Sequence, residues 1–380
     1  MIKKKKILFI TGTRADFGKL HPLMDIVEKS NKFTCYIFVT GMHTLSKYGS
    51  THQEVEKCIH KNIFIYKNQK DETKQEIILA NTIYGLSQYI KNITPDMIVV
   101  HGDRIEALAG AIAGSFNNIL VSHIEGGEIS GTIDELIRHA VTKLSHIHFV
   151  ANRKAKSRLI QLGELYNSIS IIGSPDIDVM RKEELPTLKE VKNYYNIKFE
   201  IYGILIFHPI ATEQRGLKKQ ISTLTSALKE SKKKYVVIFP NNDMGSEIII
   251  NNYLKLKKNK NFRIFPSIKF QYFLTLLKNA EFIIGNSSAG IRESEVYGTP
   301  TIDIGTRQKN RTTNKNIINI QCEKTRILNT IKKINQKRFA VKNNFGGVKN
   351  SDQKFIRTLS NKDTWKIPIQ KQFIDRDKNR

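Results

Sequence analysis

Short apolar runs alternate with amphipathic stretches along most of the chain. In the first half, strand-like runs rich in β-branched and aromatic residues occupy residues 7–11, 33–41, 98–100, 119–121, 146–151 and 169–173. Helical spacing of apolar residues lies between them, at residues 20–28, 73–93, 135–144 and 155–162. Apolar strands that alternate with helices are typical of a parallel sheet covered by helices. Residues 42–66 show a less regular pattern.

The second half repeats this alternation after a polar link at residues 181–200. Its strand-like runs occupy residues 202–209, 235–240, 262–267, 280–290 and 300–305. A chain of 380 residues is longer than a single domain with one hydrophobic core usually is. We therefore predict an α/β protein with two Rossmann-like domains that face a central cleft. The predicted domains are residues 1–180 and 181–362, and a tail at 363–380 is expected to pack back on the first domain.

Composition narrows the class of protein. The formal net charge is +27, but the lysines are spread along the whole chain without an arginine-rich or aromatic-interleaved block. This pattern indicates biased composition more than a nucleic-acid interface, although the charge would steer anionic substrates toward the protein. No apolar run is long enough to span a bilayer, and the basic start leads into a strand-like run without a signal-peptide cleavage site. Three scattered cysteines form neither a disulfide framework nor a metal-ligand spacing, so we expect a cytoplasmic protein without a bound metal.

Three acids follow the ends of two neighbouring strands in the central segment. Asp103 comes just after the run at 98–100, Glu125 follows the run at 119–121, and Asp134 lies at the start of the next helical pattern. Ligands of parallel sheets bind at the carboxyl ends of the strands, so the three acids are expected to face one crevice. The alternative for Asp103 and Asp134 is helix capping, where Asp is common.

The turn after the first strand reads GTRADFGK and carries Arg14 and Lys19. It lacks the GxGxxG of a dinucleotide fingerprint, and its glycine spacing and the Leu20 position exclude a P-loop. A turn at a helix start suits an anion, so both cations are candidate ligands of a phosphate. The alternative is a solvated surface turn.

The second half has two candidate phosphate contacts. His208 follows its first strand and is a candidate phosphate ligand, acid or base, or alternatively a structural cap. The segment GNSSAGIRE follows a later strand, and Ser287, Ser288 and Gly290 would open a helix whose amides hold a diphosphate. Glu293 could accept hydrogen bonds from a ribose, or be an ordinary solvated helix acid. Without a metal cluster, a Ser-His-Asp order or a kinase motif set, acid–base chemistry by carboxylates and His beside a diphosphate is the best interpretation.

At these residues the chain resembles the UDP-N-acetylglucosamine 2-epimerase family, and most closely its hydrolysing branch from bacterial sialic acid biosynthesis. The resemblance runs from Lys6 to about Arg311 and is loose in the tail. It is carried by ordered motifs, namely GTRADFGKL, TGMH, HGDR, HIEGGE, KLSHIHFVAN, FHP, PNND, GNSSAGIRE and IDIGTRQ. It implies a fold like the GT-B glycosyltransferases, with the nucleotide on the C-terminal domain and the sugar facing the N-terminal one. It also implies a UDP-sugar substrate, no cofactor and a homodimer.

The resemblance assigns roles to the candidate residues. Asp103, Glu125 and Asp134 match the catalytic acids of the family, and His208 matches its catalytic or phosphate-contacting histidine. Positions that hold the nucleotide sugar match the remaining candidates, which are Arg14, Lys19, Ser287, Ser288, Gly290 and Glu293.

The implied reaction converts UDP-N-acetylglucosamine and water into N-acetylmannosamine and UDP. The alternatives are the same reaction on a UDP- or GDP-linked diacetamido sugar, and a non-hydrolysing epimerase. Two positions depart from the non-hydrolysing branch. That branch has Gln-His-Arg where this chain has Gly41-Met42-His43-Thr44, so the resemblance does not extend to allosteric control by substrate. It also has a Glu pair where Glu293 is here followed by Ser294.

Overall fold

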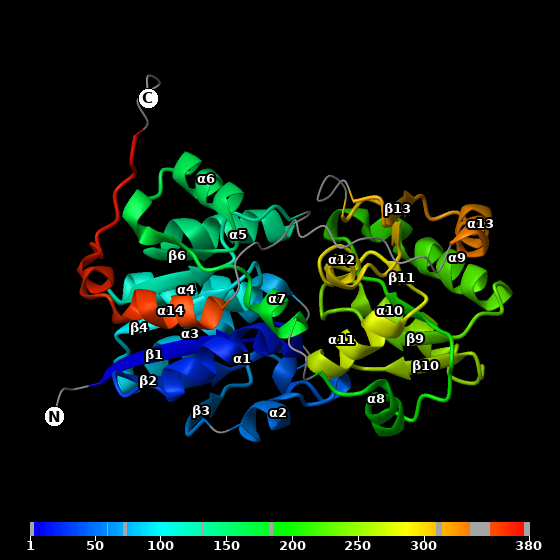
Figure 1. The fold of residues 1–380 in the computed structure, drawn as a ribbon, viewed down its shortest axis with the longest axis horizontal. Coiled ribbons are helices and arrows are strands. Elements are labelled where there is room, and N and C mark those ends of the chain that lie inside the picture. The colour runs from blue at the N-terminus through cyan, green and yellow to red at the C-terminus, as the bar shows by residue number, and fades with distance from the viewer. Residues whose placement is uncertain are drawn as a thin grey trace. The chain divides into compact units, whose positions relative to one another are not determined.

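A computed structural model describes residues 4–58, 60–70, 74–130, 133–181, 185–308, 314–334 and 350–375. The chain divides into two compact units (Figure 1). Unit 1 comprises Met1–Ile129, Ile133–Val179 and Phe345–Arg380, and unit 2 comprises Ser130–Thr132 and Met180–Asn344. Within the described residues, we found no helix with the length and hydropathy needed to cross a membrane.

Unit 1 is built on a parallel sheet of seven strands in the order β3-β2-β1-β4-β5-β6-β7. The strands are β1 (Lys5–Thr11), β2 (Phe33–Val39), β3 (Asn62–Ile65), β4 (Met97–His101), β5 (Leu120–Ile124), β6 (Ile147–Val150) and β7 (Ile169–Ile171). The α-helices are α1 (Arg14–Glu28), α2 (His52–Glu56), α3 (Gln75–Ile93), α4 (Ile105–Phe116), α5 (Ile133–Leu144), α6 (Arg153–Gln161), α7 (Pro175–Met180) and α14 (Ser351–Ser360). Short 3-10 helices are η1 (Gly41–Thr44), η2 (Ser46–Tyr48), η3 (Tyr166–Ser168) and η6 (Lys362–Lys366).

Both faces of this sheet are covered, as the continuous apolar runs predict. Side chains alternate along β1, so Phe9 packs on one face with Leu20 of α1 and Phe355 of α14. Leu8 packs on the opposite face, in the core that contains Ala111 of α4.

Helix α1 begins at Arg14, six residues before the predicted start at Leu20. The reason is a capping box: the Thr13 hydroxyl accepts a hydrogen bond from the Asp16 amide, and the Asp16 carboxylate accepts one from the Thr13 amide. Pro22 lies inside the helix. The expected loop at GTRADFGK is therefore mostly helical.

Unit 2 contains a parallel sheet in the order β10-β9-β8-β11-β12-β13. The strands are β8 (Gly203–Ile206), β9 (Tyr235–Ile238), β10 (Phe262–Phe265), β11 (Phe282–Gly285), β12 (Thr301–Ile304) and β13 (Ile317–Ile320). The helices are α8 (Leu188–Tyr194), η4 (Ala211–Gly216), α9 (Leu217–Glu230), α10 (Ser246–Leu254), α11 (Phe270–Asn279), η5 (Ser288–Gly290), α12 (Glu293–Tyr297) and α13 (Lys324–Lys333). The predicted fold class, two parallel α/β domains of Rossmann type, is confirmed.

The C-terminal part of the chain returns to unit 1. Helix α14 belongs there, whereas the sequence assigned residues up to 362 to the second domain. The boundary differs because Phe355 and Leu359 complete the unit 1 core, with the Phe355 ring 4.8 Å from that of Phe149. Farther along, the backbone oxygen of Ile369 lies 3.0 Å from His146 Nε2.

Candidate functional site

Two of the predicted acids lie at the carboxyl edge of the unit 1 sheet. His101 at the end of β4 pairs with Ile124 at the end of β5, so Asp103 and Glu125 each follow a paired strand end. Glu125 has a φ of +65°, in the left-handed region that residues other than glycine rarely adopt. Strain of this kind clusters at functional sites, so the backbone marks Glu125 independently of its side chain.

Arg138 links these two acids. It projects from α5, and its Nη1 donates a 2.5 Å hydrogen bond to the backbone oxygen of Glu125, while its Nη2 pairs with the Asp103 carboxylate. Asp134 lies four residues earlier on α5, on the same side of the helix, and is half-buried. The structure therefore connects Asp103 and Glu125 through a buried guanidinium to the helix that carries Asp134. The sequence interpretation gave Arg138 no role.

The Glu125 carboxylate belongs to a buried polar chain. Its Oε2 lies 3.4 Å from His101 Nε2, and its Oε1 accepts a 2.9 Å hydrogen bond from the Ser174 hydroxyl. Ser174 also donates to Asp176, and Asp176 forms a 3.3 Å ion pair with Lys19. Lys19 is thus tied to the strand-end acids, and the alternative of a solvated turn is wrong for it.

Arg14 is the first residue of α1 and pairs with Glu54, with 2.9 Å between Nε and Oε2. The amides of Gly12 and Thr13 donate to the Asp16 carboxylate at 3.0 and 3.2 Å. A carboxylate of the chain therefore occupies two amides of the turn where the sequence suggested a ligand anion. The role of Arg14 in binding a substrate phosphate stays a prediction.

The sequence interpretation gave no role to Glu106, a buried acid beside the turn that contains Gly12. Glu106, in the first turn of α4, is almost fully buried, and burial raises the pKa of its carboxyl. Arg104 Nε donates a 3.3 Å hydrogen bond to its Oε2. A Cβ atom at Gly12 would lie 2.5 Å from Glu106 Cδ, and one at Gly41 would lie 2.3 Å from its Oε1. Only glycine at both turns leaves room for this acid.

In unit 2, His208 is held by the end of β11. Asn286 accepts a 2.6 Å hydrogen bond from the His208 amide and donates a 2.9 Å bond to the His208 backbone oxygen. The amide of Asn241 donates to His208 Nδ1 at 3.1 Å. Because Nδ1 accepts, the proton of the neutral ring is on Nε2, which makes that nitrogen a hydrogen-bond donor. Gln308 adds a 2.8 Å bond to the Asn286 backbone oxygen.

The predicted diphosphate loop differs from expectation in its helix. After β11 the chain forms only the 3-10 turn η5, capped by the Ser287 hydroxyl, and the following α12 has five residues. A long helix does not open at Ser288. A Cβ atom at Gly290 would lie 2.8 Å from Thr301 Cγ2, so close packing requires this glycine. Glu293 is only 5% exposed, which contradicts the alternative of a solvated helix acid.

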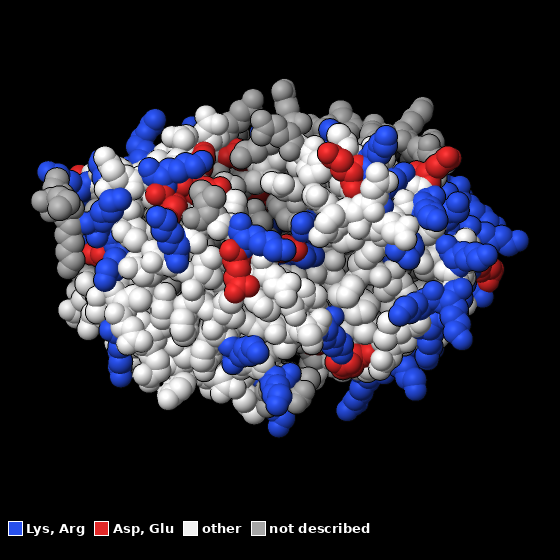
Figure 2. Space-filling view, turned by 90° about the horizontal axis from the view of Figure 1, so that it is seen from below, with Lys and Arg blue, Asp and Glu red and all other residues white. Residues whose placement is uncertain are grey.

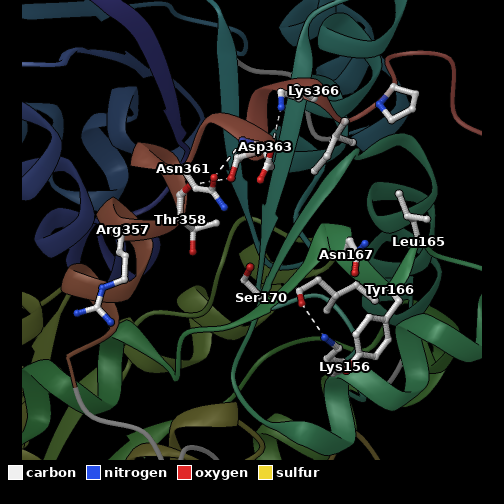
Figure 3. A pocket seen from close by; sticks show the side chains of 14 residues that line it. Lys156, Leu165, Tyr166, Asn167, Ser170, Arg357, Thr358, Asn361, Asp363 and Lys366 are labelled. Carbon is white, nitrogen blue, oxygen red and sulfur yellow. Dashed lines mark hydrogen bonds and ion pairs between the residues drawn. The ribbon is translucent and has the colours of Figure 1, made fainter.

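A cavity of about 710 Å³ in unit 1 lies away from these residues (Figure 3). It is flanked by β7 and α14, and its lining contains none of the predicted site residues. Lys156 at its edge donates a 3.0 Å hydrogen bond to the backbone oxygen of Ile169. The cavity is therefore separate from the strand-end acids.

The charge distribution is consistent with the sequence interpretation. On the face in Figure 2, lysines and arginines are densest at the right-hand end and sparse over the lower left, and acidic residues lie among them. The basic side chains do not form one continuous acid-free strip on this face.

Comparison with known proteins places the chain in a family. The profile of the family described as UDP-N-acetylglucosamine 2-epimerase matches residues 25–361. A UDP-N-acetylglucosamine 2-epimerase of Neisseria meningitidis is 46% identical over 98% of this chain and 99% of its own length. A UDP-N,N'-diacetylbacillosamine 2-epimerase (hydrolyzing) of Legionella pneumophila is 30% identical over 98% of both chains.

The fold has solved counterparts. A crystal structure of a Methanocaldococcus jannaschii UDP-GlcNAc 2-epimerase in complex with UDP-GlcNAc and UDP aligns with a TM-score of 0.76 at 23% identity, over 93% of this chain and 99% of that chain. The two parallel sheets, the ordered motifs and the extent of these matches lead to one conclusion: the chain belongs to the UDP-N-acetylglucosamine 2-epimerase family.

Proposed function

We propose that the protein is a hydrolysing UDP-N-acetylglucosamine 2-epimerase, which converts UDP-N-acetylglucosamine and water into N-acetylmannosamine and UDP. This would be the first step of bacterial sialic acid biosynthesis. The observation that carries the proposal is the pair Asp103 and Glu125, bridged by Arg138 at the carboxyl edge of the sheet in a chain of this family. The 46% identical relative, a UDP-N-acetylglucosamine 2-epimerase, supports the substrate.

The proposed reaction begins with anti elimination. The proton at carbon 2 has no neighbouring carbonyl to acidify it, so it becomes removable only as UDP leaves and positive charge develops at carbon 1. A carboxylate takes this proton, the C–H electron pair forms the double bond, and UDP departs with the electrons of the C1–O bond. The products of this step are 2-acetamidoglucal and UDP.

Hydration completes the reaction. Water adds to carbon 1, and a proton is delivered to carbon 2 on the face opposite the one from which the first was taken. We assign Asp103 as the base of the elimination, and Glu125 and Asp134 to the hydration. Arg138 would hold the Asp103 carboxylate in one orientation, because it is itself fixed to the Glu125 backbone.

Departure of UDP requires hydrogen-bond donors that stabilise the negative charge on the diphosphate, rather than bases. His208, with its Nε2–H fixed by the Asn241 amide on Nδ1, suits a hydrogen bond to a diphosphate oxygen. We propose that Ser287, Ser288 and Gly290 contribute the donors of the turn η5, that Glu293 contacts the ribose, and that Arg14 and Lys19 add positive charge. These assignments extend the roles that the family resemblance implies.

The experiment is proton NMR of the purified chain with UDP-N-acetylglucosamine in deuterium oxide. The expected products are UDP and free N-acetylmannosamine with deuterium at carbon 2, and a sample without protein serves as the control. UDP-N-acetylmannosamine as the product would contradict hydrolysis while leaving the elimination in place.

A second substrate must be tested in parallel. The 30% identical Legionella relative is a hydrolyzing epimerase of UDP-N,N'-diacetylbacillosamine, so the same chemistry on a diacetamido sugar is the competing function. The two substrates are compared by kcat/KM under one set of conditions. A higher kcat/KM for the diacetamido sugar nucleotide would overturn the proposed substrate and preserve the mechanism.

A further inference from the structure

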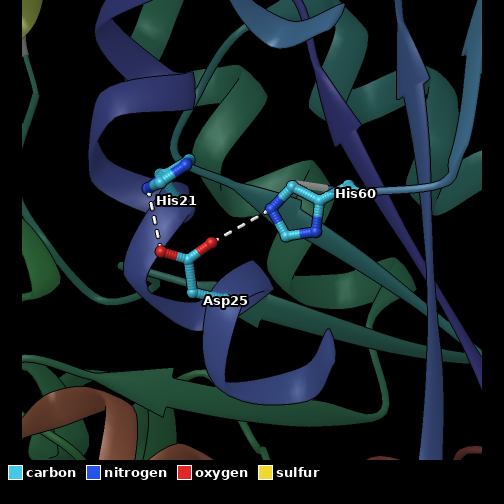
Figure 4. Close-up of side chains that lie close together, drawn as sticks. All are labelled: His21, Asp25 and His60. Atoms are coloured by element: carbon cyan, nitrogen blue, oxygen red, sulfur yellow. Dashed lines mark ion pairs between the residues drawn. The ribbon is translucent and has the colours of Figure 1, made fainter. Parts of the chain in front are cut away.

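Two histidines and an aspartate converge in unit 1. His21 and Asp25 are one turn apart on α1, and His60 lies in the segment just before β3 (Figure 4). The Asp25 carboxylate reaches both rings: its Oδ2 lies 3.2 Å from His21 Nδ1 and its Oδ1 lies 3.1 Å from His60 Nε2. In Figure 4 the two rings approach the carboxylate from different sides.

The buried ring of His60 is poorly satisfied by hydrogen bonds. Its side chain is fully buried, and among the described residues neither Nδ1 nor Nε2 has a hydrogen-bond partner of good geometry. The same holds for Asp25 Oδ1, despite its short distance from the ring. Buried polar atoms normally have partners, and the ion pair with Asp25 leaves His60 Nδ1 without one among the described residues.

The spacing of these atoms fits a shared metal ion. Zinc is bound by His nitrogen and carboxylate oxygen at about 2.0–2.2 Å in tetrahedral geometry, which puts two ligand atoms roughly 3.3 Å apart. The two distances, which reach different oxygens of the Asp25 carboxylate, are close to this value, and one donor atom from each of the three residues lies within 4.8 Å of the other two. Ligands at positions i and i+4 of one helix, as at His21 and Asp25, are a common way to present two donors on one side.

Glu28 and Cys35 supply two more potential metal-ligand atoms near His60. The donor atoms of Glu28, Cys35 and His60 all lie within 4.8 Å of one another. The Asp25 and Glu28 carboxylates near the buried ring create a negative potential that a divalent cation would offset.

We propose that His21, Asp25 and His60 bind a divalent transition-metal ion of the zinc class. Nitrogen, carboxylate and nearby sulfur donors select such an ion over magnesium or calcium. The site lies toward the amino ends of the strands: Cys35 is in the first half of β2, His60 precedes β3, and Asp25 lies near the end of α1. The acids Asp103 and Glu125 follow the carboxyl ends, so the ion would bind away from them. It would tie α1 to the segment that leads into β3, which is a structural role and does not depend on the proposed function.

Sequence spacing did not predict this site, because His60 is separated from the α1 ligands by the whole of β2 and α2.

The experiment uses the full chain, stripped with a chelator and titrated with Zn²⁺ against a chromophoric indicator. We expect one high-affinity Zn²⁺ per chain, and visible d–d absorption of tetrahedral character when Co²⁺ replaces it.

His60→Asn and Asp25→Asn should each lower the Zn²⁺ affinity by at least about 10–100-fold, since even loss of a group that only supports a metal ligand costs this much. His139→Asn is the matched control, because His139 also pairs with a carboxylate four residues away on a helix, at 3.1 Å from Glu135. If the His60→Asn protein does not fold, the Zn²⁺ affinity of variants at the partly exposed Asp25 and His21 is compared with that of the control. Absence of stoichiometric binding, or equal affinity in these variants and the control, would overturn the proposal and leave a His–Asp–His ion-pair cluster.

Discussion

Lys371 holds the C-terminal segment, drawn in red in Figure 1, against unit 1. Its ammonium lies 2.5 Å from Glu164 Oε2 and donates to the backbone oxygens of Thr142, Lys143 and Ser145 at 3.0, 3.0 and 2.7 Å. Three of its acceptors are therefore at or just beyond the C-terminal end of α5, where a cation is favourable. Replacing Lys371 with Met retains most of the side-chain length and removes the charge.

The expected loss of stability depends on the polar partners that Glu164 keeps after Lys371 is replaced. Removing one partner of a buried ion pair costs about 3–5 kcal/mol. Glu164 would keep His148 and Lys143, each at 2.9 Å, and burial lowers the pKa of Lys371, so desolvation already offsets part of the gain. We therefore expect a loss of about 2–3 kcal/mol, which for a unit of this size lowers Tm by about 4–12 °C.

The effect should depend on pH in a defined direction. Burial alone would raise the pKa of Glu164, but the His148 hydrogen bond and the Lys371 charge together lower it from 4.5 to about 2. A carboxyl with a depressed pKa stabilises the fold above its unfolded pKa and loses that contribution as pH falls toward its folded pKa. The difference between wild type and Lys371→Met should therefore be fully present near neutral pH and shrink as pH falls below about 4.5 toward about 2.

The assay is thermal and urea unfolding followed by the fluorescence of Trp365, the one tryptophan of the chain. Its ring stacks on Phe33 with 6.2 Å between centroids, so it reports on the attachment of η6 to unit 1. Lys366→Met is the control, because Lys366 is 75% exposed and pairs only with Asp363 in the described structure. Equal midpoints for the two variants would refute the claim that Lys371 anchors the tail.

Three further outcomes are expected. Asp103→Asn should lower turnover of the preferred sugar nucleotide by about 10²–10⁴-fold in the NMR assay, and near-normal turnover would exclude it as the base. Gly285→Ala should cost about 1–3 kcal/mol in urea unfolding, because φ is +136° and a Cβ would lie 1.9 Å from the Ile206 backbone oxygen; Gly305→Ala, with open space around it, should cost less. Burial lowers the pKa of His123 to about 3, so the unfolded chain takes up the proton first and stability should fall as pH drops below about 6.5; a His123→Asn protein should show a shallower slope, and an unchanged slope would contradict this assignment.

Most strands that the sequence predicted correctly are central strands covered on both faces, although the edge strands β7 and β10 were predicted as well. The run at 98–100 became β4 and the run at 119–121 became part of β5, because central strands of a parallel sheet are apolar throughout. The edge strands β3 and β13 were not predicted. Their residues are half-buried or exposed, so they lack the pattern of a strand covered on both sides.

Only the site residues whose positions follow from the order of the strands in the sheet could be predicted. The rule that ligands bind at carboxyl strand ends was enough to select Asp103 and Glu125. Which side chains join them was not predictable, because Arg138 comes from α5 and Ser174 from the segment before α7, and no periodicity relates them to the strand ends. The start of α1 was predicted six residues too late, because the apolar spacing begins at Leu20 whereas the helix begins at the capping box of Thr13 and Asp16.

Glu125 combines features that stability alone does not explain. Its left-handed backbone costs of order 1–3 kcal/mol for a residue that is not glycine, and the two residues that follow it are glycines, which would suit such a turn better. Its carboxylate is 3% exposed, and burying such a group is costly unless it is well bonded. The Ser174 hydroxyl offsets part of that second cost without removing the first. A strained, buried carboxylate at a strand end is therefore best understood as kept for its chemistry.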